Sequence, residues 1–395
     1  MSGAKSGIKI NYWWATIAAF SASLVGIGIA RFAYTPLVPA IIEAGWFSQG
    51  ATAYLGAANL AGYLLGALAA RYLGGHFSPT LVLKLMMALT AGAILACAWP
   101  LSFSWFFFWR FASGFSGAVL MVLAAPTVLA HVPPERRGLA SGVIFTGVGV
   151  GIAGSGTLIP LLLRNGVAEA WMGLGALAIV LALISWGGWP SVPPLKRVEA
   201  ALRIKPDRRL IALYAEYTLQ AFAMVPFVIF LSDYVARGLG WGLEQGSYHW
   251  GLVGAGGLVG SVIAGHLADK IGFGPALKVS YFVQVPAVAI PIFLPLPGFM
   301  AAAMLVVGIC APGTIALVLG RVRELLPGDL AGQQAGWGVA TLCFSVGQAI
   351  CAYGYSFIFA ETGNYTLIFS LGLTAMVLCT LVHIVANRGG HVPGG

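Results

Sequence analysis

The chain has 395 residues, of which 59% are hydrophobic and only 8% are charged. Soluble domains carry roughly 25% charged residues, so a soluble chain of this length could not cover its surface with so few charges. The formal net charge of +9 does not indicate nucleic-acid binding, because no basic face alternates with aromatic side chains. The composition therefore predicts an integral membrane protein.

Apolar runs recur along the whole chain, separated by glycine, proline and charged residues. A helix needs roughly 20 apolar residues to cross the hydrocarbon core of a bilayer. The first run is too long for a cleaved signal peptide, so we expect it to stay in the protein as a span. Twelve transmembrane helices are predicted, at about 12–42, 49–72, 79–99, 103–130, 138–163, 168–189, 209–235, 247–268, 275–295, 299–322, 331–358 and 364–386.

The longest connection between predicted spans is 190–208, which is rich in proline, lysine and arginine. It divides the chain into an N-terminal six-helix bundle at 1–189 and a C-terminal six-helix bundle at 209–395. The predicted fold is therefore an all-α membrane protein of two bundles, joined by a cytoplasmic linker.

Positive charge orients these spans, because cytoplasmic loops of membrane proteins carry an excess of lysine and arginine. If both termini are cytoplasmic, 17 of the 21 Lys and Arg residues lie on the cytoplasmic side, and only Arg164 and Arg237 lie in outer loops. The net charge is then explained by topology and requires no anionic partner. We expect the protein to contact the lipid bilayer along all twelve spans.

Two segments of the first half have counterparts in the second half. The second predicted span ends with Gly66 and Arg71, and the eighth ends with Gly265 and Lys270. The first and seventh spans each carry a proline four residues after a phenylalanine. Such duplication is typical of transporters whose substrate site lies at the bilayer midplane between two bundles.

Three motifs carry a resemblance to a known family. The loop after the eighth span contains Gly265, Asp269, Lys270 and Gly272, the fourth span contains Arg110, Gly114 and Gly117, and the loop into the fifth span runs from Pro134 to Gly138. Through these motifs the chain resembles the major facilitator superfamily over essentially its whole length. The sequence around Arg31 in the first span is similar to the YbfB/YjiJ group of bacterial transporters. This resemblance implies the bacterial inner membrane as the location.

The resemblance also implies a conformational latch in the loop after the eighth span. There Asp269, with Gly265 and Lys270, would cap a neighbouring helix N-terminus and stabilise the outward-open state. The first copy of the motif keeps Arg71 but has Ala70 in place of the acid. The N-terminal copy therefore lacks the acid that would cap a helix.

Three charged residues are left at membrane depth, where a charge costs several kcal/mol or more unless it faces a cavity or a partner. Arg31 and Arg110 lie at similar depth in the N-terminal half, with no acid in that half's spans, and predict a site for an anion. Glu216 is the candidate proton carrier, because desolvation disfavours an ionised carboxylate. Alternatively, Arg110 bonds helix carbonyls and rigidifies its bundle, and Glu216 is a gate residue that pairs with Arg136.

Four polar residues extend the predicted substrate site. Tyr34 follows Arg31 at i+3, and Gln220 follows Glu216 at i+4, so each pair shares a helix face. Asn59 and Gln348 lie near mid-depth in the second and eleventh spans. Each of these polar residues either contacts substrate or forms a hydrogen bond between helices, which is worth fractions of a kcal/mol to about 1–2 kcal/mol.

Other polar positions are expected to have structural roles. Asp233 and His249 lie near the outer ends of their spans, where solvated boundary residues are expected. Met300 and Met304 have no cysteine or histidine at ligand spacing, and the five cysteines form no CxxC pair. Neither a metal site nor a cofactor is predicted.

The predicted function is secondary active transport of a small organic anion, coupled to protons in the uptake direction, by alternating access of two bundles. The alternative is a proton-coupled exporter of drugs or metabolites. The fifth span lacks the Gly-Pro pair usual in antiporters of the superfamily, which weakens that alternative. No Walker-type ATP motif and no paired carboxylates occur, so neither an ATPase nor another enzyme is expected. We expect a monomer.

Overall fold

The computed structural model describes residues 12–133, 136–191 and 207–387. Within these residues, twelve helical stretches are long and apolar enough to cross a membrane. This confirms the prediction of twelve transmembrane helices, whose bounds differ from the predicted ones by a few residues. The uninterrupted spans are α3 (Gln49–His76), α4 (Pro79–Ala96), α5 (Phe103–Leu129), α6 (Arg137–Leu163), α7 (Val167–Ser185), α9 (Leu243–Ile271), α10 (Phe273–Phe293), α11 (Pro297–Leu325), α12 (Leu330–Thr362) and α13 (Tyr365–Asn387).

The first span consists of three successive segments. They are α1 (Tyr12–Ser23), the π-helical η1 (Leu24–Phe32) and α2 (Tyr34–Glu43). Pro36 has no N–H to donate, so the regular helical bond pattern cannot continue through this region. Wider π turns of this kind are frequent at functional sites, and this one contains Arg31. The seventh span is similarly divided into α8 (Arg208–Asp233) and η4 (Tyr234–Gly238).

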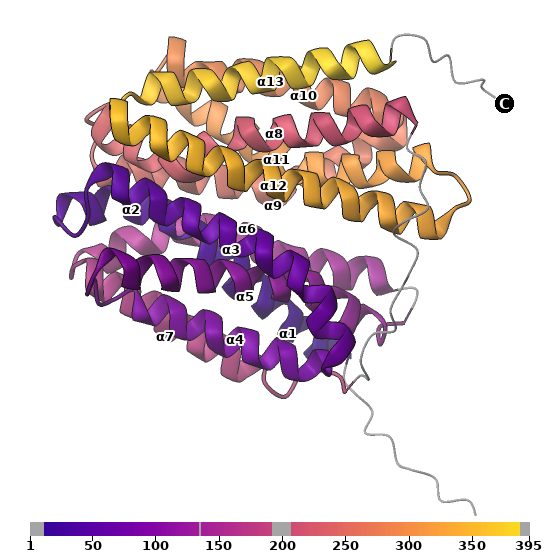
Figure 1. The fold of residues 1–395 in the computed structure, drawn as a ribbon, viewed down its shortest axis with the longest axis horizontal. Coiled ribbons are helices and arrows are strands. Elements are labelled where there is room, and N and C mark those ends of the chain that lie inside the picture. Colours follow the sequence, from indigo (N-terminus) through magenta and orange to yellow (C-terminus); the bar gives the residue numbers. More distant parts are fainter. Residues whose placement is uncertain (1–11, 134–135, 192–206, 388–395) are drawn as a thin grey trace, which may run out of the picture.

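The spans form two groups that follow the order of the chain. Figure 1 shows α1 to α7 on one side of the molecule and α8 to α13 on the other. Each group has its own apolar core, one built from Ala15 to Trp189 and the other from Leu210 to Cys379. The two six-helix bundles of the predicted fold are thus confirmed. The linker boundaries at 190–208 remain a prediction, since 192–206 lie outside the described residues.

Glycines bring two helix pairs into backbone contact at matching places in the halves. A Cβ atom on Gly114 of α5 would lie 1.9 Å from the Asn59 carbonyl oxygen of α3. In the second half, a Cβ atom on Gly308 of α11 would lie 2.1 Å from the Val253 carbonyl oxygen of α9. Small residues at such crossings let membrane helices approach closely. The internal repeat therefore extends to the packing of α3 on α5 and of α9 on α11.

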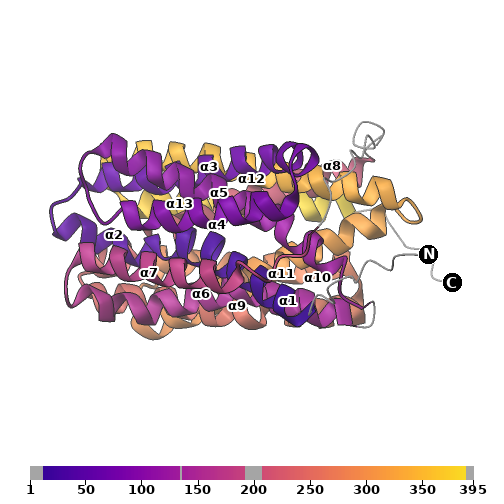
Figure 2. The same ribbon diagram turned by 90° about the horizontal axis from the view of Figure 1, so that it is seen from below.

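The two halves are in backbone contact near one end of the molecule. An even number of spans puts Tyr12 and Asn387 at the same end, which we call the terminal end, and Figure 2 shows α1 there and α2 at the opposite, far end. Nearer the far end, a Cβ atom on Gly156 of α6 would lie 2.4 Å from the Cα atom of Gly251 on α9. Nearer the terminal end, Cβ atoms on Gly142 and Gly265 of the same helices would meet no atom of the described residues within 4 Å. The structure is thus closed between α6 and α9 near the far end.

Candidate substrate site between the two halves

Both buried arginines of the N-terminal half border one small cavity. Its volume is about 10 Å³, which is room for about one water molecule. The lining residues come from the first, second and fourth spans and, on the opposite side, from α8. They are Arg31, Tyr34, Gly56, Asn59, Leu60, Arg110, Val228 and Ile229. The cavity therefore has two cationic side chains and no acidic one.

Arg31 joins the two halves across this cavity. Its Nη2 donates a hydrogen bond to Oε1 of Gln348 on α12, at 2.8 Å. Its guanidinium lies over the rings of Phe32 and Tyr63, with 5.1 and 5.2 Å between the guanidinium carbon and the ring centroids. The side chain is buried, and its Nε has no hydrogen-bond partner within the described residues. Arg31 is therefore only partly satisfied by the protein.

Arg110 is held more firmly than Arg31. Its Nη1 donates to the Ala30 carbonyl at 2.7 Å, and its guanidinium carbon lies 4.1 Å from the centroid of the Tyr34 ring. The structure therefore contains the hydrogen bond from Arg110 to a helix carbonyl that the alternative interpretation expected. Its buried Nε, however, has no partner among the described residues. Arg110 can thus stiffen the bundle and still offer a donor to a ligand.

Asn59 and Tyr34 complete the N-terminal wall of the cavity. The Asn59 amide nitrogen donates to the Ala30 and Arg110 carbonyls, at 3.4 and 3.2 Å, and to the Ser113 hydroxyl at 2.9 Å. The Tyr34 hydroxyl donates to the Thr52 carbonyl at 2.8 Å. Asn59 thus joins three helices, and its buried Oδ1 is left without a partner in the described part of the chain.

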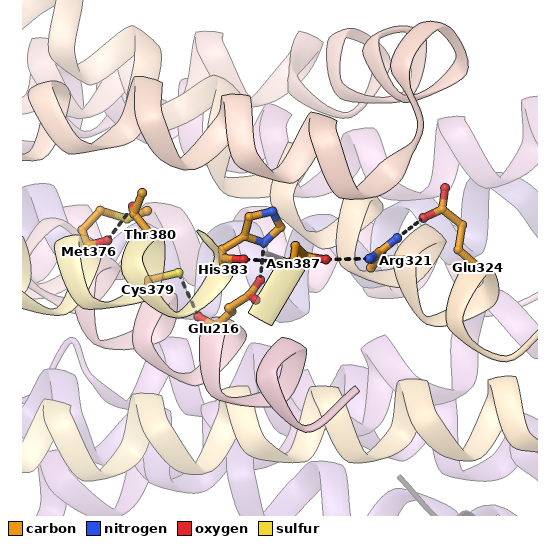
Figure 3. A network of polar contacts seen from close by, with 8 residues as sticks. All are labelled: Glu216, Arg321, Glu324, Met376, Cys379, Thr380, His383 and Asn387. Carbon is orange, nitrogen blue, oxygen red and sulfur yellow. Dashed lines mark hydrogen bonds and ion pairs between the residues drawn. The ribbon is translucent and has the colours of Figure 1, made fainter. Parts of the chain in front are cut away.

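The structure does not bring Glu216 or Gln220 to this cavity. Gln220 donates to Oε1 of Gln284 at 3.3 Å, inside the C-terminal half. Glu216 accepts from or donates to Nδ1 of His383 on α13, at 2.9 Å, so its partner is this histidine rather than Arg136 (Figure 3). Sequence reasoning considered His249 but not His383, which lies three residues before the end of the last predicted span. A search for every titratable residue at membrane depth would have found it.

Asp233 and His249 are not solvated boundary residues, and that expectation was wrong. Each is only 1% exposed. Asp233 forms an ion pair with Nε of Arg237 at 2.8 Å and accepts a hydrogen bond from the Tyr365 hydroxyl. Nearness to a span end did not imply contact with water, because the Tyr365 side chain lies against this carboxylate.

A polar cluster at the far end connects the halves through Gln49, Asp233, Arg237 and Tyr365. The amide nitrogen of Gln49, from α3, donates to the Tyr365 hydroxyl at 2.7 Å and to Asp233 at 3.5 Å. Thr35 adds a further bond between the halves, to the Val228 carbonyl. Because opening the far end would separate these groups, the cluster stabilises the closed arrangement.

Combining Gln49→Ala with Asp233→Asn is expected to shift the protein toward a state that is open at the far end. Each lost hydrogen bond is worth about 1 kcal/mol, so the open population should rise several-fold. The measurement is the rate at which a cysteine at the buried position Ala53 reacts with a membrane-impermeant maleimide. Gln245→Ala removes an exposed glutamine at the same end and serves as the control. Equal labelling rates in both variants would show that the cluster does not hold the far end closed.

The predicted latch residues lie apart from the cavity. Asp269 and Lys270 are exposed near the end of α9, and within the described ranges their side chains form no hydrogen bond or ion pair. Instead Glu324 accepts a bond from the Phe273 backbone N–H at 2.9 Å, at the start of α10. Arg71 lies on α3, and its side chain is outside the described part. The latch remains a prediction for the conformation closed at the terminal end.

Comparison with known proteins agrees with this architecture. The chain is similar to the structure of a bacterial homologue of the human lysosomal transporter Spinster, in an inward-facing and occupied conformation, with a TM-score of 0.78, 15% identity and coverage of 98% of this chain and 100% of that one. It is also similar to the nucleoside transporter NupG, with a TM-score of 0.76, 12% identity and coverage of 94% and 100%. At these identities the likeness shows the fold alone.

Sequence comparison reaches the family. Two curated relatives from Mycobacterium tuberculosis, both named uncharacterized MFS-type transporters (MT3072 and Rv2994), are 27% identical over 206 residues. That match covers 51% of this chain and 46% of the relatives, so the chain spans about half the length of the curated relatives it matches. The family described as "Uncharacterised MFS-type transporter YbfB" matches residues 23–384. The chain thus belongs to the YbfB family of MFS-type transporters, and it is a multi-pass membrane protein.

Proposed function

We propose that this protein carries a small organic anion across a bacterial inner membrane by alternating access, in the uptake direction and coupled to protons. The supporting observation is the cavity between the halves, which two buried arginines and no acid border. Arginine stays charged at every relevant pH. An anion in this cavity would neutralise positive charge that the protein leaves uncompensated, and it would accept from the two unpartnered Nε donors.

The bond between Arg31 and Gln348 suggests how binding could drive the movement of the halves. It connects η1 to α12 across the interface. An anion that binds the Arg31 guanidinium would either displace Gln348 from it or bind beside Gln348. In both cases the attraction between the halves would change. Only a difference in affinity between two states can shift their populations. Gln348 is therefore the C-terminal residue that we assign to substrate binding.

The unpartnered Oδ1 of Asn59 adds a requirement for the substrate. This atom is an acceptor, buried on the cavity wall, with no donor near it in the described residues. A buried acceptor without a partner costs about 1–3 kcal/mol. An anion that also carries a hydroxyl or an amine would satisfy it, so we expect hydroxy or amino acids to bind better than simple carboxylates of the same size.

A thermal-shift screen of the purified protein with small carboxylates, phosphates and sulfonates tests the anion proposal. Saturating ligand at 100 times its Kd should stabilise the protein by about 2.7 kcal/mol. Neutral amide or alcohol analogues are the matched controls and should not raise the Tm. Stabilisation by neutral or cationic compounds alone would contradict an anion site.

Proteoliposomes with an imposed pH gradient then test direction and coupling. With the orientation predicted from the positive charges, uptake predicts that the best anion of the screen accumulates together with protons moving down their gradient. The exporter alternative predicts that the anion moves against the proton flow. Transport at the same rate without a gradient would remove proton coupling from the proposal and leave the anion site intact.

A further inference from the structure

A carboxyl group and an imidazole lie side by side inside the C-terminal bundle, away from the arginine cavity. Oε2 of Glu216 on α8 is 2.9 Å from Nδ1 of His383 on α13. Their side chains are 2% and 5% exposed. Figure 3 shows the two side chains facing each other. Both residue types can gain or lose a proton in the physiological range when their surroundings allow it.

The separation of these atoms requires a proton between them. Two lone pairs facing each other at 2.9 Å would repel, so either the imidazole N–H donates to the carboxylate or the carboxylic acid donates to the imidazole. With only this proton, the pair carries one negative charge. A second proton, taken from water, makes the pair neutral overall. The pair can thus take up and release one proton without breaking any other bond.

The surroundings of the pair limit which other groups could hold this proton. Tyr281 of α10 lies edge-on to His383, with 5.5 Å between ring centroids, and its hydroxyl lies beside Glu216 and Cys379. The Cys379 thiol of α13 donates its hydrogen bond to the Glu216 backbone carbonyl. From α11, the cation Arg321 acts on Glu216 electrostatically. Tyrosine, cysteine and arginine have higher reference pKa values than carboxyl and imidazole groups, so proton exchange in this cluster is assigned to the hydrogen-bonded pair.

A chain of contacts runs from the pair to the terminal end. The Asn387 amide nitrogen donates to the His383 carbonyl at 2.8 Å, and its Oδ1 accepts from Arg321 at 2.9 Å. Arg321 in turn forms an ion pair with Glu324, whose side chain is 32% exposed. His383 lies one helical turn, about 6 Å, before the last residue of α13, so the pair is near the terminal end of the C-terminal bundle.

The pair is also connected to the arginine cavity through one stacked contact. Tyr217, next to Glu216 on α8, stacks on Phe344 of α12 with 4.4 Å between ring centroids. Gln348 lies one turn further along α12 and accepts the bond from Arg31. A change of charge at Glu216 that moves α8 against α12 would therefore reach the hydrogen-bond partner of Arg31.

We propose that Glu216 and His383 form a proton-binding pair that exchanges its proton with the terminal end while the far end is closed. The proposal rests on the proposed function for the coupling of this proton to an anion. His383 is then a second proton-binding residue, beside the carboxylate. The proton site and the anion site are separate places in the molecule: the proton site lies inside the C-terminal half, and the anion site lies between the halves.

Infrared difference spectroscopy of the full-length protein in lipid bilayers tests this proposal, with the proton itself as the probe. Acidification of the wild-type protein should raise a carboxylic-acid C=O band that shifts in heavy water. Glu216→Gln should remove this band, and His383→Gln should change the pH at which it appears. Asp233→Asn, which alters another buried carboxyl group, at the far end, should leave the band in place.

Two results would overturn the proton-binding pair. One is a wild-type spectrum without any titrating band that depends on Glu216, and the other is an identical titration in wild type and His383→Gln. If Glu216→Gln does not fold, Glu216→Asp keeps the carboxyl group on a shorter side chain and should shift the frequency of the band. Since no anion is added, the outcome is independent of whether Arg31 binds one, and failure of either proposal can be told from failure of the other.

Discussion

Replacing Arg31 with alanine is expected to abolish accumulation of the anion while the protein remains folded. Truncating one partner of a buried, hydrogen-bonded charge pair costs about 3 kcal/mol, or roughly a hundredfold in Kd. The fold should tolerate the change, because within the described residues the side chain forms its one hydrogen bond with Gln348 and otherwise lies against two aromatic rings. The measurement is anion binding by thermal shift, followed by uptake into proteoliposomes.

Three further variants separate charge from shape at this site. Arg31→Lys keeps the positive charge but loses the planar fork, so we expect binding between that of wild type and Arg31→Ala. Gln348→Ala should weaken binding less, because it removes a neutral partner. Lys84→Ala removes a cation that lies over the Trp186 ring, remote from the cavity, and should bind the anion as wild type does. Unchanged binding in Arg31→Ala would exclude the anion site.

The features predicted correctly from sequence are those that depend on local patterns. Hydropathy and the position of positive charges gave the number of spans, because a lipid environment imposes both on each segment separately. Depth along a helix follows from counting residues at about 1.5 Å each. That count placed Arg31 and Arg110 at similar depth, and the structure puts both at one cavity.

The features that sequence did not predict depend on the rotation of each helix about its own axis. Glu216 and Gln220 share a face of α8, as their spacing requires, but the i, i+4 rule does not say which neighbour that face meets. The apolar pattern offers no help, because the seventh span is buried almost all round from Gln220 on α8 to Ala236 on η4. In the structure the shared face meets α10 and α13, so Glu216 meets His383 and Gln220 meets Gln284.

Gly114→Ala is expected to have the largest effect of any single methyl group added to this protein. The new Cβ atom would lie 1.9 Å from a backbone oxygen of α3, so the two helices would have to separate. Overpacking costs about 1–3 kcal/mol where side chains can move aside, and a clash with backbone should reach or exceed the upper limit. We expect little folded, monodisperse protein, and a lower Tm in whatever folds, by size-exclusion chromatography and thermal unfolding in detergent.

Gly92→Ala is the matched control, because its Cβ atom would meet nothing within 4 Å. It should leave the Tm unchanged or raise it, since alanine favours a helix over glycine by about 1 kcal/mol. Gly308→Ala repeats the clash in the other half, at 2.1 Å from the Val253 carbonyl, and should be as damaging. Equal Tm values for Gly114→Ala and Gly92→Ala would contradict the close approach of α3 and α5. That approach also positions the substrate site, because Asn59 contacts Gly114 through its backbone and Ser113 through its amide, one turn from Arg110.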